Sequence, residues 1–139
     1  MCELAPIFTL LLLTSIFSTA QNPKTTYGPV PIKAAREPNP VPATPESIAE
    51  GKRIYGYDCA SCHGATGDGK TAAAKNLKMP NLTSPDLKNH TDGELCYVIK
   101  NGHGDMPAEG DRVKPEQLWD LVNYVRTFPK NEPVANTKP

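Results

Sequence analysis

Residues 59–71 of the chain, CASCHGATGDGKT, carry two overlapping motifs that require different surroundings. From Cys59 to His63 the string is C-x-x-C-H, a spacing used for covalent attachment of haem. From Gly64 to Thr71 it fits G-x-x-x-x-G-K-[ST], the loop that cradles nucleotide phosphates. A phosphate loop works only when a buried strand leads into it and a helix begins at its lysine. The rest of the chain therefore decides which motif is used.

The first twenty residues have the pattern of an export signal. An uncharged apolar run from Ile7 to Phe17 is followed by small residues that suit a signal-peptidase site before Gln21. Eleven residues is short of the ~20 that a membrane-spanning helix needs. We expect a signal peptide over residues 1–20, with an uncleaved anchor as the alternative, because Glu3 stands where positive residues are usual.

Two further segments are not expected to form a core. Residues 21–44 contain six prolines and no helical or alternating apolar period, so they predict an extended, proline-rich linker. Residues 131–139 predict a flexible tail. Charge indicates no partner, because 15 Lys and Arg balance 15 Asp and Glu, and nothing points to nucleic acid. The folded domain is therefore expected over residues 45–130.

Three helices are predicted within this domain. The first has Thr44 as N-cap, begins at Pro45 and ends just before Cys59. The second begins with a capping box, Thr91 to Glu94, and the third begins at Pro115 with an apolar stripe along it. The segments between them are rich in Gly and Pro and contain no credible strand. The predicted class is all-α, with long loops and few aromatic residues, so something other than side chains should fill the centre.

These surroundings reject the nucleotide motif and favour the other one. The residues before Gly64 are no strand, and residues 72–78 allow barely two helical turns. In C-x-x-C-H each position has a task, because two thiols reach one edge of a haem and the adjacent imidazole reaches its iron. A thioredoxin-type dithiol would need a βαβ setting, which the chain lacks. A zinc site would need Cys96, His90 or His103 to join the two cysteines, and the spacing fits no common pattern.

With these residues in place, the chain resembles the class I c-type cytochromes, specifically the small bacterial mono-haem type, over residues 46–128. The matching positions are Gly51, Tyr55, the C-x-x-C-H string, Pro80, Leu82, Met106, Pro107, Leu121 and Tyr124. The resemblance implies a cytochrome c fold wrapped around one covalently bound haem c. It also implies that the first and last helices cross closely, with Gly51 and Tyr55 meeting Leu121 and Tyr124.

The resemblance also implies the roles of the site residues. Cys59 and Cys62 would form the thioether bonds to haem, and His63 and Met106 would be the axial ligands of its iron. The Pro80 carbonyl would accept a hydrogen bond from the His63 ring. His103, on the same loop as Met106, is chemically competent but is expected to face solvent, and His90 is expected at the surface. Cys96 is expected to be a small buried hydrophobe, and no disulfide is expected.

A haem with His and Met ligands has no open site for substrate, so the predicted function is electron transport rather than catalysis. We expect a carrier of single electrons between respiratory or other redox partner proteins outside the cytoplasm, in the periplasm. The alternative is a membrane-tethered haem subunit of a larger oxidoreductase complex, held through residues 7–17. A third reading is a peroxidase-like or gas-binding enzyme in which Met106 dissociates. The near-neutral domain, with 11 Lys and Arg and 12 Asp and Glu over residues 44–130, predicts weak electrostatic steering.

Overall fold

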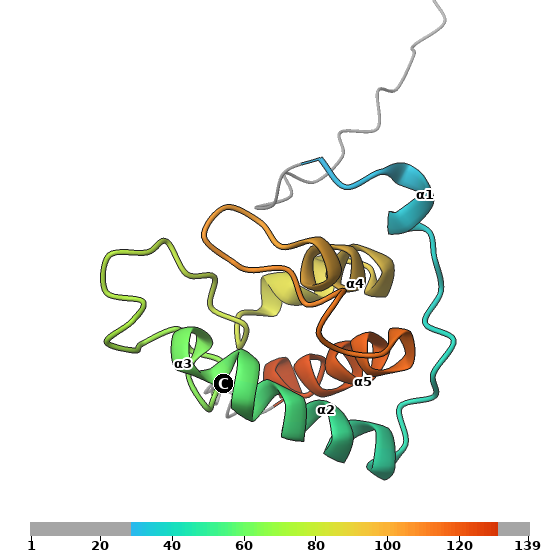
Figure 1. Cartoon of the computed structure of the whole chain (residues 1–139), viewed down its shortest axis with the longest axis horizontal. Coiled ribbons are helices and arrows are strands. Elements are labelled where there is room, and N and C mark those ends of the chain that lie inside the picture. Colours follow the sequence, from blue (N-terminus) through green and yellow to red (C-terminus); the bar gives the residue numbers. More distant parts are fainter. Residues whose placement is uncertain (1–28, 131–139) are drawn as a thin grey trace, which may run out of the picture.

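The computed structural model describes residues 29–130, and this part of the chain is helical, with no strand (Figure 1). The elements in chain order are α1 (Ile32–Ala35), α2 (Pro45–Asp58), α3 (Ala60–His63), the 3-10 turn η1 (Pro85–Asn89), α4 (Asp92–Asn101), α5 (Pro115–Val125) and the 3-10 turn η2 (Phe128–Lys130). The predicted all-α class is confirmed, and the three predicted helices are α2, α4 and α5.

Local capping groups start α2 and α4 where the sequence predicts, and Pro115 stands at the first position of α5. The Thr44 hydroxyl accepts a hydrogen bond from the Ser47 N–H at 3.2 Å, ahead of Pro45 at the first helical position. In α4 both bonds of the capping box form, Glu94 N–H to the Thr91 hydroxyl at 3.1 Å and Thr91 N–H to the Glu94 carboxylate at 2.8 Å. These bonds satisfy amides that the helix itself leaves without acceptors.

Helices α2 and α5 pack face to face and form the centre of the core. A Cβ placed on Gly51 would lie 2.0 Å from the backbone oxygen of Asp120, so the two backbones approach as closely as glycine allows. One turn further along α2, the Tyr55 ring lies 5.3 Å from the rings of both Tyr124 and Phe128. The predicted close contact of the first and last helices is confirmed by this packing.

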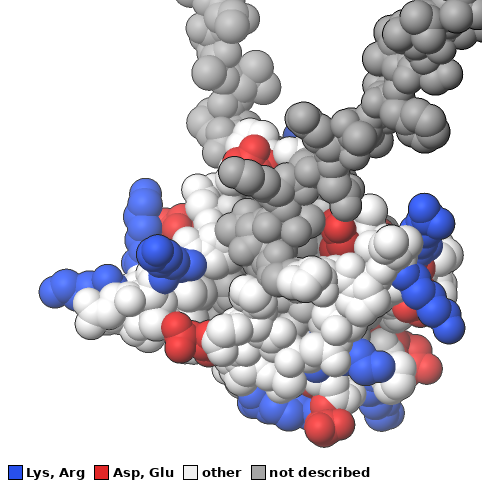
Figure 2. Space-filling model, turned by 90° about the horizontal axis from the view of Figure 1, so that it is seen from above, with Lys and Arg blue, Asp and Glu red and all other residues white. Residues whose placement is uncertain are grey.

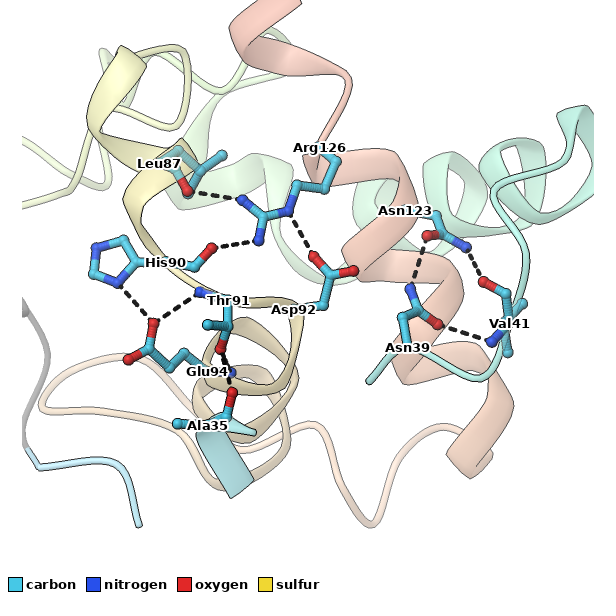
Figure 3. Close-up of polar contacts among 10 residues, drawn as sticks. All are labelled: Ala35, Asn39, Val41, Leu87, His90, Thr91, Asp92, Glu94, Asn123 and Arg126. Atoms are coloured by element: carbon cyan, nitrogen blue, oxygen red, sulfur yellow. Dashed lines mark hydrogen bonds and ion pairs between the residues drawn. The ribbon is translucent and has the colours of Figure 1, made fainter. Parts of the chain in front are cut away.

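Residues 31–44, here called the strap, run across α4 and α5 instead of forming a free linker. The Thr91 hydroxyl at the start of α4 donates to the carbonyl of Ala35 at 2.6 Å (Figure 3). The buried Asn123 of α5 accepts from the Asn39 amide at 2.8 Å and donates to the Val41 carbonyl at 3.1 Å. Val41 itself packs against the core.

The expectation of an extended linker that adds nothing to the core is therefore wrong for the strap, which contains α1 and packs Val41 against the core. Helix α1 has only four residues, too few for an apolar period to be visible in the sequence. The strap is held mainly by hydrogen bonds to residues far along the chain, and no local pattern reports such bonds. The signal peptide or anchor at 1–20, the start of the linker before residue 29 and the tail at 131–139 lie outside the described residues. Within residues 29–130, no helix is long and apolar enough to span a bilayer.

Replacing Asn123 by alanine is expected to loosen the strap and to lower the free energy of unfolding by about 1–3 kcal/mol, because buried polar groups of the strap lose their partner. Hydrogen exchange at the strap amides should quicken, while exchange in the C-terminal half of α2, away from the Ser47 hydroxyl that Asn123 also bonds at 2.8 Å, changes little. Asn101→Ala is the matched control, since that exposed amide bonds only to the Tyr97 carbonyl of its own helix. Equal protection of the strap in Asn123→Ala and in the unchanged protein would contradict this role.

Candidate haem-binding site

The C-x-x-C-H residues form a single helical turn directly after α2. Cys59 ends α2, and its carbonyl accepts hydrogen bonds from the N–H groups of Cys62 at 3.2 Å and His63 at 2.9 Å. Side chains three and four residues apart on a helical turn are neighbours. The fold therefore presents both thiols and the imidazole from one turn. Cys59 and Cys62 are half-buried free cysteines, and burial raises the pKa of the Cys59 thiol to about 12.

His63 has the state and surroundings of a metal ligand. The residue is buried, with 8% of its surface exposed, and burial lowers the pKa of its imidazole and so favours the neutral ring that binds metals. Its Nδ1 is a buried atom without a hydrogen-bond partner. An imidazole held in this way fits a haem on its other nitrogen, with Nδ1 left for an acceptor of the protein.

The acceptor expected for Nδ1, the Pro80 carbonyl, does not make that bond in this structure. It is nevertheless close to the turn. The Pro80 oxygen lies 3.6 Å from the position that a Cβ on Gly69 would take, and the Gly69 N–H donates to the His63 carbonyl at 2.8 Å. The residue predicted to orient the ring is therefore a neighbour of the ring's own backbone.

The glycine loop that follows His63 supports the C-x-x-C-H turn. The buried Tyr55 hydroxyl donates to the Gly64 carbonyl at 2.8 Å, and the Thr71 hydroxyl donates to the Cys62 carbonyl at 3.0 Å. Gly67, at a φ of 77°, packs against the Phe128 ring, which would lie 3.0 Å from a Cβ at that position. These contacts explain the glycine-rich composition of the loop.

Several amides of the same loop are already bonded within the protein. Gly67 N–H donates to the Gly64 carbonyl at 3.1 Å, Gly69 N–H to the His63 carbonyl, and Lys70 N–H to the Asp68 carboxylate at 3.1 Å. A phosphate loop needs such amides turned toward the ligand at a helix start. The sequence of the loop therefore fits the nucleotide motif, but its structure does not.

Met106 lies on the loop between α4 and α5, in a turn closed by two backbone hydrogen bonds. His103 N–H donates to the Met106 carbonyl at 3.0 Å, and Met106 N–H donates to the His103 carbonyl at 2.9 Å. Gly102 and Gly104 supply the positive φ values that this turn requires, 74° and 55°. His103 is exposed, as expected, whereas Met106 is half-buried.

Two other sequence predictions have different outcomes. Cys96 is buried in the core of the domain, which confirms its role as a small hydrophobe, and burial raises its pKa to about 11. His90 was expected at the surface, which is wrong, because its side chain is only 11% exposed and faces the Glu94 carboxylate at 3.5 Å (Figure 3). The reason is that η1 turns the chain back onto the start of α4.

Sequence reasoning missed a charged group of residues that joins the Met106 loop to the end of α2. Glu109 is 2% exposed, and one of its carboxylate oxygens accepts from the Arg112 guanidinium at 3.0 Å. The same guanidinium bonds to Asp58, directly before Cys59, at 2.6 Å. The other Glu109 oxygen, Oε2, is buried without a partner. A Glu and an Arg three residues apart in a polar loop normally face solvent, so the sequence carries no sign of this burial.

A helical domain built around a C-x-x-C-H turn, with a neutral buried histidine, defines a c-type cytochrome domain. A profile of the family described as "Cytochrome C oxidase, cbb3-type, subunit III" matches residues 46–125. The chain is 32% identical over 80 residues to cytochrome c6 of Cladophora glomerata, covering 58% of this chain and 87% of that one. It is 34% identical over 84 residues to cytochrome c6 of Nostoc sp., covering 60% of this chain and 73% of that one.

The chain belongs to the cytochrome c family, whose members bind a covalent haem c with its iron. It is also 30% identical over 130 residues to the quinohemoprotein alcohol dehydrogenase ADH IIB of Pseudomonas putida, covering 92% of this chain but only 18% of that protein. Among solved structures, the Kuenenia stuttgartiensis reducing HAO-like protein complex matches with a TM-score of 0.57 at 23% identity, over 64% of this chain and 46% of that one. The KustC0563 c-type cytochrome matches with a TM-score of 0.53 at 25% identity, over 56% of this chain and 95% of that one.

These comparisons confirm three sequence predictions: the resemblance to c-type cytochromes, the cytochrome c fold and the haem c cofactor. Membership of the cytochrome c family indicates a domain that carries electrons through its haem.

Proposed function

We propose that the protein carries single electrons between redox proteins outside the cytoplasm, with Cys59 and Cys62 bonded to haem and His63 and Met106 as axial ligands. The observation that carries the proposal is the buried His63, whose Nδ1 has no partner, on a turn that also presents two half-buried thiols. Bound haem supplies a reversible one-electron change between Fe(III) and Fe(II), in which methionine ligation favours the reduced metal.

The protein's own groups hold the ligands in place. Tyr55 and Thr71 fix the backbone on either side of His63 through their bonds to the carbonyls of Gly64 and Cys62. On the opposite loop, the paired backbone bonds between His103 and Met106 limit where the thioether can lie. A site whose ligands are fixed in both redox states needs little rearrangement when the charge changes.

The surface fits brief contact with partner proteins better than strong electrostatic capture. On the face seen in Figure 2, Lys and Arg side chains stand around the rim with Asp and Glu beside them, and no broad field of one sign covers the visible surface. This agrees with the near-equal charge counts of the domain. Such a surface gives only weak steering toward a partner.

The location outside the cytoplasm is proposed from the sequence. The apolar run from Ile7 to Phe17 and the small residues after it suit export. Thioether bonds to haem also remove a pair of thiols that would tend to oxidise outside the cytoplasm. The proposal names the donor and the acceptor only by their class, which is redox proteins that exchange one electron.

The function is tested on the protein matured with haem. We expect a mass increase of one haem, a redox titration that follows a single one-electron curve, and a reduced form that binds carbon monoxide only slowly because Met106 occupies the iron. Rapid binding of carbon monoxide by the folded, reduced protein would overturn the carrier function and favour a gas-binding or peroxidase-like role.

A second candidate, a tethered haem subunit of an oxidoreductase complex, is favoured by one observation. The similarity to the alcohol dehydrogenase covers 92% of this chain but only 18% of the dehydrogenase, so the matching region is a small part of that larger protein. Because the strap is docked, only residues 21–30 remain between the first segment and the domain, and ten extended residues span roughly 30 Å. Recovery of the full-length mass from the membrane fraction would support this candidate. Recovery of a shortened chain in the soluble extracytoplasmic fraction would support the free carrier.

A further inference from the structure

Glu109 is a buried carboxyl that neither the fold nor the proposed ligand set requires. It belongs with Leu121 and Val122 among the largest fully buried side chains of the described residues, and its side chain is 3% exposed. It lies three residues beyond Met106, on the loop that leads to α5. A buried carboxyl without full hydrogen bonding is costly, so its position calls for a reason.

The backbone around Glu109 holds the side chain inside. Its N–H donates to the Ile99 carbonyl of α4 at 3.0 Å, and its own carbonyl accepts from the N–H groups of Arg112 at 3.0 Å and Val113 at 3.2 Å. These bonds fix the main chain at the point where the side chain enters the interior. Oε2 of the carboxyl is buried there without a partner.

The ionisable groups that act on Glu109 come from its own loop and from the end of α2. Arg112 bonds to Oε1 at 3.0 Å, but its side chain is 52% exposed and it is shared with Asp58. The negative charge of Asp58 opposes ionisation of Glu109, and so does burial, which is the larger effect. Together they outweigh Arg112 and raise the Glu109 pKa above the ordinary value of 4.5. The contact from α4 is the backbone carbonyl of Ile99, which carries no ionisable group.

Arg112 links Glu109 to the start of the haem-binding turn, because the guanidinium that bonds to Glu109 at 3.0 Å also bonds at 2.6 Å to Asp58, the residue before Cys59. Burial is the main cause of the raised pKa of the Cys59 thiol, and the carboxylate of Glu109 is the strongest charge that adds to it. In the proposed function this thiol becomes a thioether to haem. The carboxyl is buried on the same side of the domain as the haem-binding turn, where a change of charge on the iron would be poorly screened.

We propose that Glu109 binds one proton when the haem iron is reduced and releases it when the iron is oxidised. On reduction, one electron from the donor protein converts Fe(III) to Fe(II), and one proton from solvent converts the Glu109 carboxylate to a carboxylic acid. The added negative charge is thereby neutralised within the domain. The half-exposed Arg112 marks the side on which Glu109 lies nearest to solvent. The inference rests on the proposed function, because it needs an iron that changes by one charge.

The sign of the pH dependence follows from this linkage. The reduced site has one positive charge fewer, so Glu109 binds its proton more tightly in the reduced protein than in the oxidised protein. The reduction potential is then highest at low pH and falls as pH rises through the range in which Glu109 titrates. A tenfold difference in proton affinity between the two redox states corresponds to a fall of about 59 mV for a one-electron couple.

The test is the reduction potential of the haem-loaded protein measured against pH in three variants. We expect a fall of about 59 mV in the unchanged protein, for a tenfold change in affinity. In Glu109→Gln the fall should be lost. It should be retained in Glu116→Gln, the matched control, which removes an exposed carboxylate from the first turn of α5. The same fall in Glu109→Gln as in the unchanged protein would overturn the proposal and assign the proton to another group, such as a haem propionate.

Two further measurements keep the test decisive. Redox-difference infrared spectra should show a carboxylic acid band that appears on reduction and shifts in heavy water; absence of this band in the unchanged protein overturns the proposal. If Glu109→Gln does not fold, Glu109→Asp is used, because it keeps a carboxyl in a different position. The fall in reduction potential should then occur at a different pH, and a fall at the same pH as in the unchanged protein overturns the proposal. Failure of the electron-carrier function looks different, because the unchanged protein would then give no reversible one-electron titration at any pH.

Discussion

Met106→Ala is expected to lower the reduction potential by on the order of 0.1–0.3 V, a fraction of the ~0.8 V over which axial ligands set haem potentials. The reason is that the thioether favours Fe(II), and alanine offers no ligand in its place. The reduced variant should also bind carbon monoxide rapidly, since the sixth position is open. Both effects are measured on the folded, haem-loaded protein, by spectroelectrochemistry and by stopped-flow mixing with carbon monoxide.

His103→Ala is the matched control for this prediction, because His103 lies on the same closed turn and its backbone bonds to Met106 do not use the imidazole. Its exposed side chain should be dispensable, so the potential and the slow binding of carbon monoxide should stay unchanged. The ligand assignment would be contradicted if His103→Ala caused the drop in potential and Met106→Ala left it unaffected.

Gly51→Ala is expected to destabilise the domain by about 3 kcal/mol, the upper part of the usual range for overpacking. The added Cβ would lie 2.0 Å from the Asp120 carbonyl oxygen and 2.9 Å from the Tyr124 Cβ, so α2 and α5 would have to separate. Because this contact involves backbone, no side-chain rotation relieves it. For a domain of this size the melting temperature should fall by more than about 10 °C.

The control for Gly51→Ala lies on the same helix. A Cβ on Gly56 would meet nothing within 4 Å, so Gly56→Ala should be neutral or should stabilise α2 by up to about 1 kcal/mol through helix propensity. Thermal unfolding of the haem-loaded variants, followed by circular dichroism, checks both. Equal melting temperatures for the two variants would show that the α2–α5 contact is not as tight as the structure has it.

The helices of the domain were predictable because their signals are local. A cap, a proline at the first turn and an apolar stripe all lie within a few residues of one another, as at Thr44 and Thr91. The C-x-x-C-H turn is equally local, since five consecutive residues identify it. The pairing of the first and last helices needed the family resemblance, because no single stripe says which partner it will meet.

The strap, the burial of His90 and the position of Glu109 were not predictable for the opposite reason. The strap and Glu109 depend on bonds between residues distant in sequence, Asn39 to Asn123 and Arg112 to Asp58, whereas His90 depends on the turn that η1 makes onto the start of α4. Polar residues in a loop are usually solvated, so the sequence favours the wrong environment for all three. The Met106 ligand role stays a prediction that rests on the family resemblance, because Met106 lies 43 residues after His63 and no local pattern joins the two.

The most direct test of the proposed carrier is the optical spectrum of the oxidised, haem-loaded protein in the far red. Ligation of ferric iron by the Met106 sulfur predicts a weak charge-transfer band there, which should be present in the unchanged protein and in His103→Ala and lost in Met106→Ala. A spectrum without this band in the unchanged protein, or a band that survives in Met106→Ala, would contradict a six-coordinate His63 and Met106 site.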